Sequence, residues 1–149
     1  MTTLNLHSES LQTGWLDGYG HLNEVFYLVP FSNATWKVQD HFGIGLDYFN
    51  NTGCAIYTVE THMRYLREVH APAELNISTE IFGADQKRIW FAHQMYVDDT
   101  LRATAEFMAL HYSTRDNKTV PMPESVQQAL LQFKVTELPE WAGRQLSLK

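Results

Sequence analysis

The chain has 149 residues, a length that predicts one domain and allows folding without disulfides. Its net charge of −6 argues against binding to nucleic acid phosphates. The single cysteine, Cys54, excludes an internal disulfide and a cysteine-rich zinc site. The first ten residues lack the pattern of a signal peptide, and no apolar run approaches the ~20 residues that span a bilayer. We therefore expect a soluble cytoplasmic protein with no membrane partner and a reduced thiol.

The first third of the chain predicts a short strand, a glycine loop and a helix. Residues 4–13 alternate as a short edge strand does, and glycines then mark a loop. From Leu22 the apolar residues follow a helical period, which Pro30 is expected to end or kink. A second helical stretch is predicted over residues 31–42, closed by the glycines that follow it.

After residue 53 the apolar period changes to two, which predicts a run of strands. The expected strands cover residues 55–66, 75–81, 88–97 and 101–114, with turns at 70–72 and 83–86 and a hairpin at Asp98–Asp99. A last helix is predicted over residues 124–133. We expect a core over about residues 4–134 and a peripheral tail beyond Pro139 within one domain, 1–149.

Short turns between consecutive strands imply antiparallel pairing, and only one main helix is available to cover the sheet. The predicted fold class is therefore α+β, with one curved antiparallel sheet wrapped around one main helix.

The segment from Trp15 to Leu28 holds the chemistry-bearing side chains Asp17, His21 and Asn23 next to the predicted start of the helix. An acid at that place can act as a base or a nucleophile, and helix N–H groups can stabilise an oxyanion. Acids and amides before helices are also common caps, and glycines are common turn residues. Spacing alone favours this structural interpretation.

Asp17, Gly20, His21 and Asn23 resemble the Asp-x-x-Gly-His-x-Asn motif of the hotdog-fold acyl-CoA thioesterases, the group similar to 4-hydroxybenzoyl-CoA thioesterase. The resemblance extends over residues 13–126. It implies the hotdog fold, matching the predicted order of elements, and a catalytic Asp17. The chain departs from the motif at Glu24, where many members carry a second asparagine.

A narrower resemblance connects three stretches, residues 58–66, 83–89 and 103–111, to the thioesterases of carnitine breakdown. Members of that group are taken to hydrolyse betainyl-CoA to glycine betaine and CoA. The resemblance therefore implies an acyl-CoA substrate, with betainyl-CoA as the specific expectation.

Four residues are candidates for catalysis. Asp17 is the predicted base or nucleophile, and Glu60 on the strand over residues 55–66 is the competing carboxylate. His21 and Asn23 are predicted to orient the thioester carbonyl or a water molecule, although a structural histidine and a capping asparagine remain alternatives. The histidines show no His-x-x-x-His pair, so we expect no metal and no cofactor.

Substrate binding requires positive charge for the CoA phosphates and, for betainyl-CoA, rings for a trimethylammonium group. The candidate phosphate ligands are Arg64, Arg67, Lys87 and Arg88, with a solvated sheet face as the equal alternative. Aromatic residues are more often used for packing, but five are candidates for the acyl group: Trp15, Trp36, Tyr57, Trp90 and Tyr96.

The resemblance also implies sheets paired edge to edge, in a homodimer or a tetramer of dimers, with sites at subunit junctions. Two other functions stay open from the residues alone. One is a hotdog hydratase or dehydratase, although between residues 31 and 42 only His41 offers a candidate histidine. The other is a non-catalytic acyl-CoA-binding module.

Overall fold

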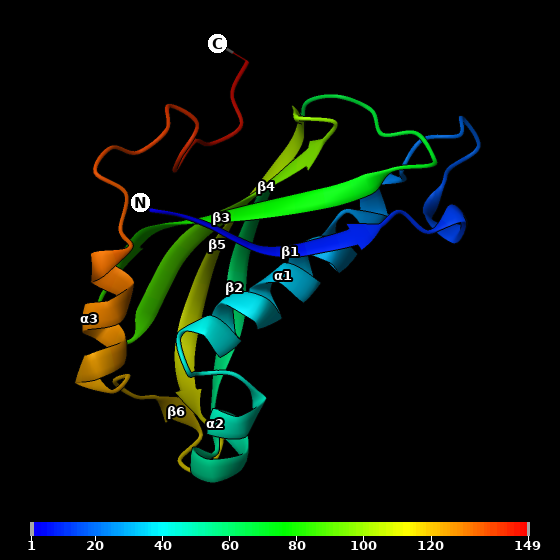
Figure 1. Cartoon of the computed structure of the whole chain (residues 1–149). Helices are drawn as coiled ribbons and strands as arrows, with labels where there is room; N and C mark the ends of the chain where they lie inside the picture. The colour runs from blue at the N-terminus through cyan, green and yellow to red at the C-terminus, as the bar shows by residue number, and fades with distance from the viewer. Residues whose placement is uncertain (1, 149) are drawn as a thin grey trace.

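A curved antiparallel sheet wraps around the helix α1 in the computed structural model, which describes residues 2–148. The helix lies along the inside of the curved sheet (Figure 1). This arrangement confirms the predicted α+β fold class. In chain order the strands are β1 (Thr3–Ser10), β2 (Cys54–Tyr65), β3 (Glu74–Ala84), β4 (Arg88–Val97), β5 (Thr100–Ser113) and β6 (Lys118–Thr119). The helices are α1 (Leu28–His41), α2 (Leu46–Thr52) and α3 (Glu124–Gln132), with 3-10 turns at Thr13–Trp15 and Glu24–Phe26.

The sheet order is β1-β3-β4-β5-β2, with β6 paired to β5. The strands β3, β4 and β5 pair antiparallel in sequence order, as predicted. The expectation is wrong for β2 and β3, because β2 pairs with β5 whereas β3 pairs with β1 and β4. Both edges of β3 are thus occupied, so the segment that follows β2 must carry the chain from one side of the sheet to the other. That crossing segment, residues 66–73, becomes important for the site.

The main helix begins later than its apolar period indicates. A 3-10 turn occupies Glu24–Phe26, and α1 runs from Leu28 to His41. The predicted end or kink at Pro30 is wrong, since Pro30 lies in the first turn of α1, where its missing N–H has no intrahelical partner to lose. The sequence analysis also did not predict α2, Leu46–Thr52, which is short.

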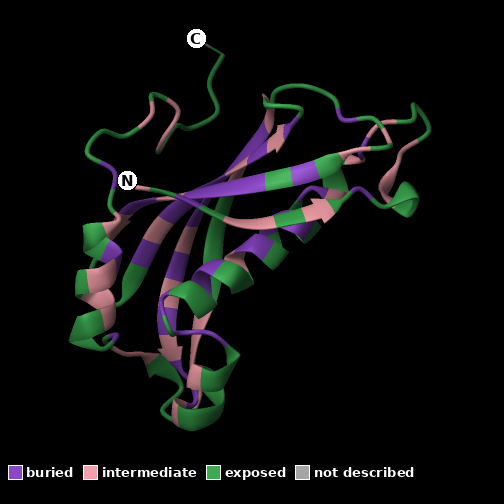
Figure 2. Ribbon diagram, in the orientation of Figure 1, coloured by how far each residue is buried: buried purple, intermediate pink, exposed green. Residues whose placement is uncertain are grey.

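One stripe of α1 faces the sheet and carries the core (Figure 2). Phe31, Ala34 and Val38 are buried there, at the helical spacing i, i+3 and i+7. They pack with alternating residues of the sheet strands, such as Phe91 of β4 and Phe107 of β5. Because side chains alternate across a strand, every second residue of β4 and β5 lies instead on the outer face.

The C-terminal residues cover part of that outer face. Trp141 packs against Phe82 with ring centroids 5.6 Å apart, and Arg64 lies 4.7 Å from the Trp141 ring centroid. The carboxylate of Glu106 accepts the N–H of Gly143 at 2.8 Å. Among residues 2–148, no helix has the length and apolar character needed to cross a membrane.

Candidate functional site

A groove of about 610 Å³ lies where the loop before α1 meets the end of β2 and the crossing segment. The loop contributes Asp17, His21 and Asn23, the three motif residues. The crossing segment contributes Arg67 and Glu68. The sheet order explains the meeting, because the crossing segment pairs with the loop before α1 on its way from β2 to β3, where the Leu22 N–H donates to the Val69 carbonyl at 2.8 Å.

The carboxylate of Asp17 is half-buried and held by its own loop. Asp17 Oδ1 accepts the backbone N–H of Tyr19 at 2.8 Å and that of His21 at 3.1 Å. The Asp17 N–H in turn donates to the His21 carbonyl at 2.8 Å, and Gly20 takes the positive φ of 81° that closes this turn. Both side-chain bonds go to Oδ1, so Oδ2 takes no part in the turn. The motif therefore orients the carboxylate through one oxygen and leaves the other outside the hydrogen bonds of the turn.

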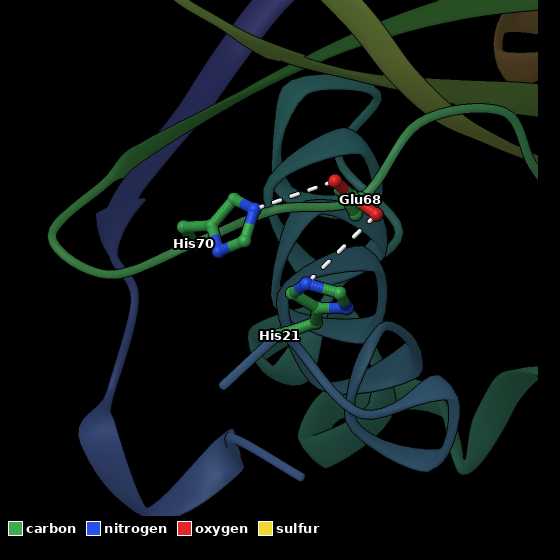
Figure 3. A group of neighbouring side chains, drawn as sticks. All are labelled: His21, Glu68 and His70. Atoms are coloured by element: carbon green, nitrogen blue, oxygen red, sulfur yellow. Dashed lines mark ion pairs between the residues drawn. The ribbon is translucent and has the colours of Figure 1, made fainter. Parts of the chain in front are cut away.

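His21 contacts two residues of the crossing segment (Figure 3). The Glu68 carboxylate lies between two imidazoles, with Oε2 3.8 Å from His21 Nε2 and Oε1 3.5 Å from His70 Nε2. An isolated antiparallel bridge joins the backbones of His21 and His70, and their rings meet edge to face with centroids 4.4 Å apart. The structure thus brings together two histidines that are far apart in the sequence.

Tyrosine rings supply the aromatic surface of the groove. Tyr27 is buried, Tyr65 is half exposed, and their rings meet edge to face at 5.0 Å. The Tyr65 hydroxyl donates to the Glu24 carbonyl at 3.3 Å. Burial raises the pKa of both tyrosines, so both hydroxyls stay protonated at neutral pH. Tyr19 stands at the rim of the groove, 86% exposed.

Asn23 caps the turn that precedes α1. Its Oδ1 accepts the N–H of Val25 at 3.1 Å, and its carbonyl accepts the N–H of Phe26 at 2.9 Å. This is the structural role that the sequence analysis gave as the alternative for this residue.

Glu60, the competing carboxylate, lies in a different groove. Glu60 is paired with Met108, which is paired with Trp90, so the three residues share the outer face of the sheet. That groove, about 310 Å³, is lined by Glu60, His62 and Trp90 among others. Within one chain the structure does not bring Glu60 to the groove of Asp17.

The predicted aromatic residues are dispersed rather than gathered. Trp15 stacks on Phe26 with centroids 6.4 Å apart, close to the motif, and Trp90 Nε1 donates to Glu106 at 2.7 Å on the outer face. Among the described residues, the lining of the Asp17 groove includes none of the five predicted rings: Trp15, Trp36, Tyr57, Trp90 and Tyr96.

Of the four predicted phosphate ligands, Arg67 lines the Asp17 groove. Arg64 lies on the outer face, where its Nε donates to Thr104 Oγ1 at 3.0 Å and burial lowers its pKa. Lys87 and Arg88 line a further groove of about 520 Å³, and Arg88 is paired with Asp85 at 2.6 Å. The bases therefore form no single cluster within one chain.

The sequence analysis missed several residues of the groove: Tyr19, Tyr27, Tyr65, Glu68 and His70 cluster at or beside it. The sequence did contain a signal for two of these residues. Glu68 and His70 stand two positions apart, and both side chains can bind a metal or transfer a proton, which marks them as candidates for a site. Their partner His21 could not be found from spacing, since it precedes Glu68 by 47 positions in the sequence.

Comparison with known proteins places the chain in a family. A profile of the thioesterase-like superfamily matches residues 11–130. The chain belongs to this superfamily, which confirms the resemblance carried by the motif around Asp17.

Two relatives within reach of sequence comparison have names that state an activity. The chain is 32% identical to the betainyl-CoA thioesterase of Pseudomonas aeruginosa, over 90% of this chain and 88% of that one. It is 40% identical to the L-carnitine dehydrogenase/betainyl-CoA thioesterase of Agrobacterium fabrum, covering 94% of this chain. The chain spans only 30% of the length of that second relative.

Solved structures agree on the fold. The protein SAV2348 of Staphylococcus aureus, solved in complex with CoA, superposes with a TM-score of 0.89 at 21% identity, covering 100% of this chain and 98% of that one. A candidate thioesterase from Pseudomonas putida KT2440 superposes with a TM-score of 0.81 at 30% identity, covering 100% of this chain and 99% of that one.

Proposed function

We propose that this protein hydrolyses a short acyl-CoA thioester to the free acid and CoA. The observation that carries the proposal is the Asp17 carboxylate, oriented by its turn at the wall of the groove. Membership of the thioesterase-like superfamily supports it. The CoA complex of SAV2348 supports CoA as the carrier, and Arg67, which lines the groove, is the proposed ligand for its phosphates.

Two routes fit this arrangement. In one, Asp17 removes a proton from water, the oxygen attacks the thioester carbonyl carbon, and CoA leaves as the thiolate. In the other, Asp17 attacks the carbonyl, CoA leaves, and water hydrolyses the resulting mixed anhydride. In both routes, backbone N–H groups at the start of α1 are the proposed donors to the oxyanion.

The proposed acyl group is betainyl, a trimethylammonium cation. The named relatives support this choice, and so does the charge of the groove. Among the described residues, its lining holds three carboxylates, Asp17, Glu24 and Glu68, and one arginine, Arg67. A quaternary ammonium group is attracted both by carboxylates and by ring faces. Tyr65, half exposed beside Glu24, offers such a ring.

The test of the reaction is thiol release from acyl-CoA substrates by wild type and by Asp17→Asn. Asparagine keeps an oxygen that can accept the Tyr19 and His21 N–H groups, so the loop is preserved while the base is lost. We expect kcat/KM to fall by at least about 100-fold. Glu60→Gln is the matched control and should stay near wild type. Loss of release in Glu60→Gln alone would move the base to β2, and no release by wild type would overturn the proposal.

The test of the acyl group compares betainyl-CoA with its neutral isostere, 3,3-dimethylbutyryl-CoA. The two differ in charge but not in shape, so we expect kcat/KM to favour the cation by about tenfold or more. Tyr65→Leu should reduce this preference, whereas Tyr96→Leu, on β4 and outside the lining of the groove, should not. Equal rates for the two substrates would contradict the choice of betainyl-CoA.

We further propose that the protein forms a homodimer, or a tetramer of dimers, with sheets paired edge to edge as the family resemblance implies, and we place the junction at the free edge of β2. A cytoplasmic location is part of the same proposal, supported by the free thiol of Cys54.

A further inference from the structure

His21, Glu68 and His70 bring three metal-ligating groups together, and one ligand atom of each lies within 4.8 Å of the others (Figure 3). We propose that they bind a divalent transition-metal ion of the zinc type. The two imidazoles and one carboxylate are the ligand types that zinc takes in open, three-ligand sites, with the fourth position left to water. A site for Mg²⁺ or Ca²⁺ would require mainly oxygen ligands, so the donor set selects against these ions.

The distances are close to those that an ion requires. Two ligand atoms of a tetrahedral zinc ion lie about 3.3 Å apart when each is about 2.0 Å from the metal. Here Glu68 Oε1 is 3.5 Å from His70 Nε2, and Glu68 Oε2 is 3.8 Å from His21 Nε2. The three ligand atoms all lie within 4.8 Å of one another. Small side-chain rotations are enough to close them around one ion.

The backbone already holds the ligands in place. The bridge between His21 and His70 fixes the two segments side by side, and Glu68 is only two positions from His70. Two of the three side chains are largely exposed, 63% for Glu68 and 58% for His70, so they are free to rotate and an ion can enter from solvent. Because the bridge fixes the backbones, binding orders only side chains, which lowers its entropic cost.

The ion would lie beside the residue proposed for catalysis. The His21 N–H donates to Asp17 Oδ1 at 3.1 Å, and His21 and Glu68 line the same groove as Asp17. A bound cation would hold His21 and attract the Asp17 carboxylate, so we expect zinc to inhibit hydrolysis. This consequence rests on the proposed function, whereas metal binding itself does not.

The experiment titrates the tag-free full chain with ZnCl₂ by calorimetry, and with Co²⁺ by the visible absorbance of the bound ion. We expect saturation at one ion per chain. His70→Gln and Glu68→Gln should each weaken binding by at least about tenfold. The matched control is His7→Gln, because His7 and Glu9 form a histidine–carboxylate pair with a 2.5 Å contact and belong to no three-ligand group among residues 2–148. This control should bind zinc as wild type does.

The proposal is overturned if no saturable binding is found, or if His70→Gln binds as tightly as wild type. Circular dichroism of each variant separates loss of a ligand from loss of the fold. The titration contains no substrate, so its failure leaves the thioesterase proposal standing. A chain that hydrolyses no thioester can equally still bind the metal.

Discussion

The imidazole of His93 has no exposed surface and joins two layers of the fold. Its Nε2 is 2.8 Å from the hydroxyl of Thr35 on α1, and its Nδ1 is 2.8 Å from that of Thr79 on β3. Burial, with a smaller contribution from His7, lowers the pKa of His93 to about 3. The protein therefore keeps this histidine neutral, and a proton on it would be a charge inside the core.

His93 should make the fold sensitive to acid. Its pKa is lower in the folded chain than the ~6.5 of an unfolded one, so below that pH the unfolded state binds the extra proton. The free energy of unfolding should fall by about 1 kcal/mol per pH unit as the pH drops from about 6.5 toward 4. Urea unfolding at several pH values measures this slope, and His93→Gln should lower it. The exposed His41 is the control, since His41→Gln should keep the wild-type slope. An unchanged slope in His93→Gln would contradict the prediction.

The hairpin between β4 and β5 shows how local sequence and local structure agree. Asp98 and Asp99 take φ values of 50° and 61°, so both central residues are left-handed, as the tight two-residue turn requires. Aspartate tolerates this conformation better than most residues but less well than glycine. The Asp-Asp pair was readable from the sequence because it stands between two alternating runs.

Asp99→Gly should therefore stabilise the hairpin by about 0.5–1 kcal/mol, because glycine adopts a positive φ without strain. Asp99→Val should destabilise the protein, since a branched Cβ is disfavoured at this φ. Denaturant unfolding of both variants measures the effect. We expect the two variants to change the free energy of unfolding in opposite directions. If both change it in the same direction, backbone strain at this turn does not decide their stability.

The segment between β1 and the middle of α1 was harder to predict from the sequence than the strands were. The apolar period from Leu22 continues through the 3-10 turn at Glu24–Phe26, but only part of it is buried: Leu22 and Phe26 pack in or against the core, whereas Val25 is 64% exposed. Apolar spacings of three and four residues fit a 3-10 turn as well as an α-helix, so they could not locate the start of α1 at Leu28. Pro30 was misread because its effect depends on whether it lies in the first turn or further along.

At the scale of the whole molecule, the sheet ends in two strands, β1 and β2, and within the described residues each is paired on one side only. The end strand β2 pairs with β5 on one side only. It exposes apolar side chains, with Tyr57 44% and Val59 56% accessible. Edge strands of this kind are usually covered or paired, which supports the proposed dimer.

Val59→Lys should weaken the proposed dimer, because a charge at the centre of the free edge opposes its pairing with a second copy. Sedimentation or light scattering should give at least twice the 17.2 kDa chain mass for wild type, shifting toward one chain in the variant. Leu131→Lys is the control, since Leu131 is similarly exposed on α3, and its mass should stay as in wild type. A monomeric wild type would overturn the proposed assembly.

The sequence by itself determined the type of the main secondary-structure elements, helix or strand, and the motif at the site. Alternation identified the strands, and the spacing of Asp17, Gly20, His21 and Asn23 identified the loop and its family, because these are local patterns along the chain. The sheet order β1-β3-β4-β5-β2 is a tertiary choice, made by which strand edges pair. That choice sends residues 66–73 across the fold and brings Glu68 and His70 to His21, while leaving Glu60 on the outer face. The tertiary structure alone decided these neighbours, because each depends on packing between segments that no periodicity connects.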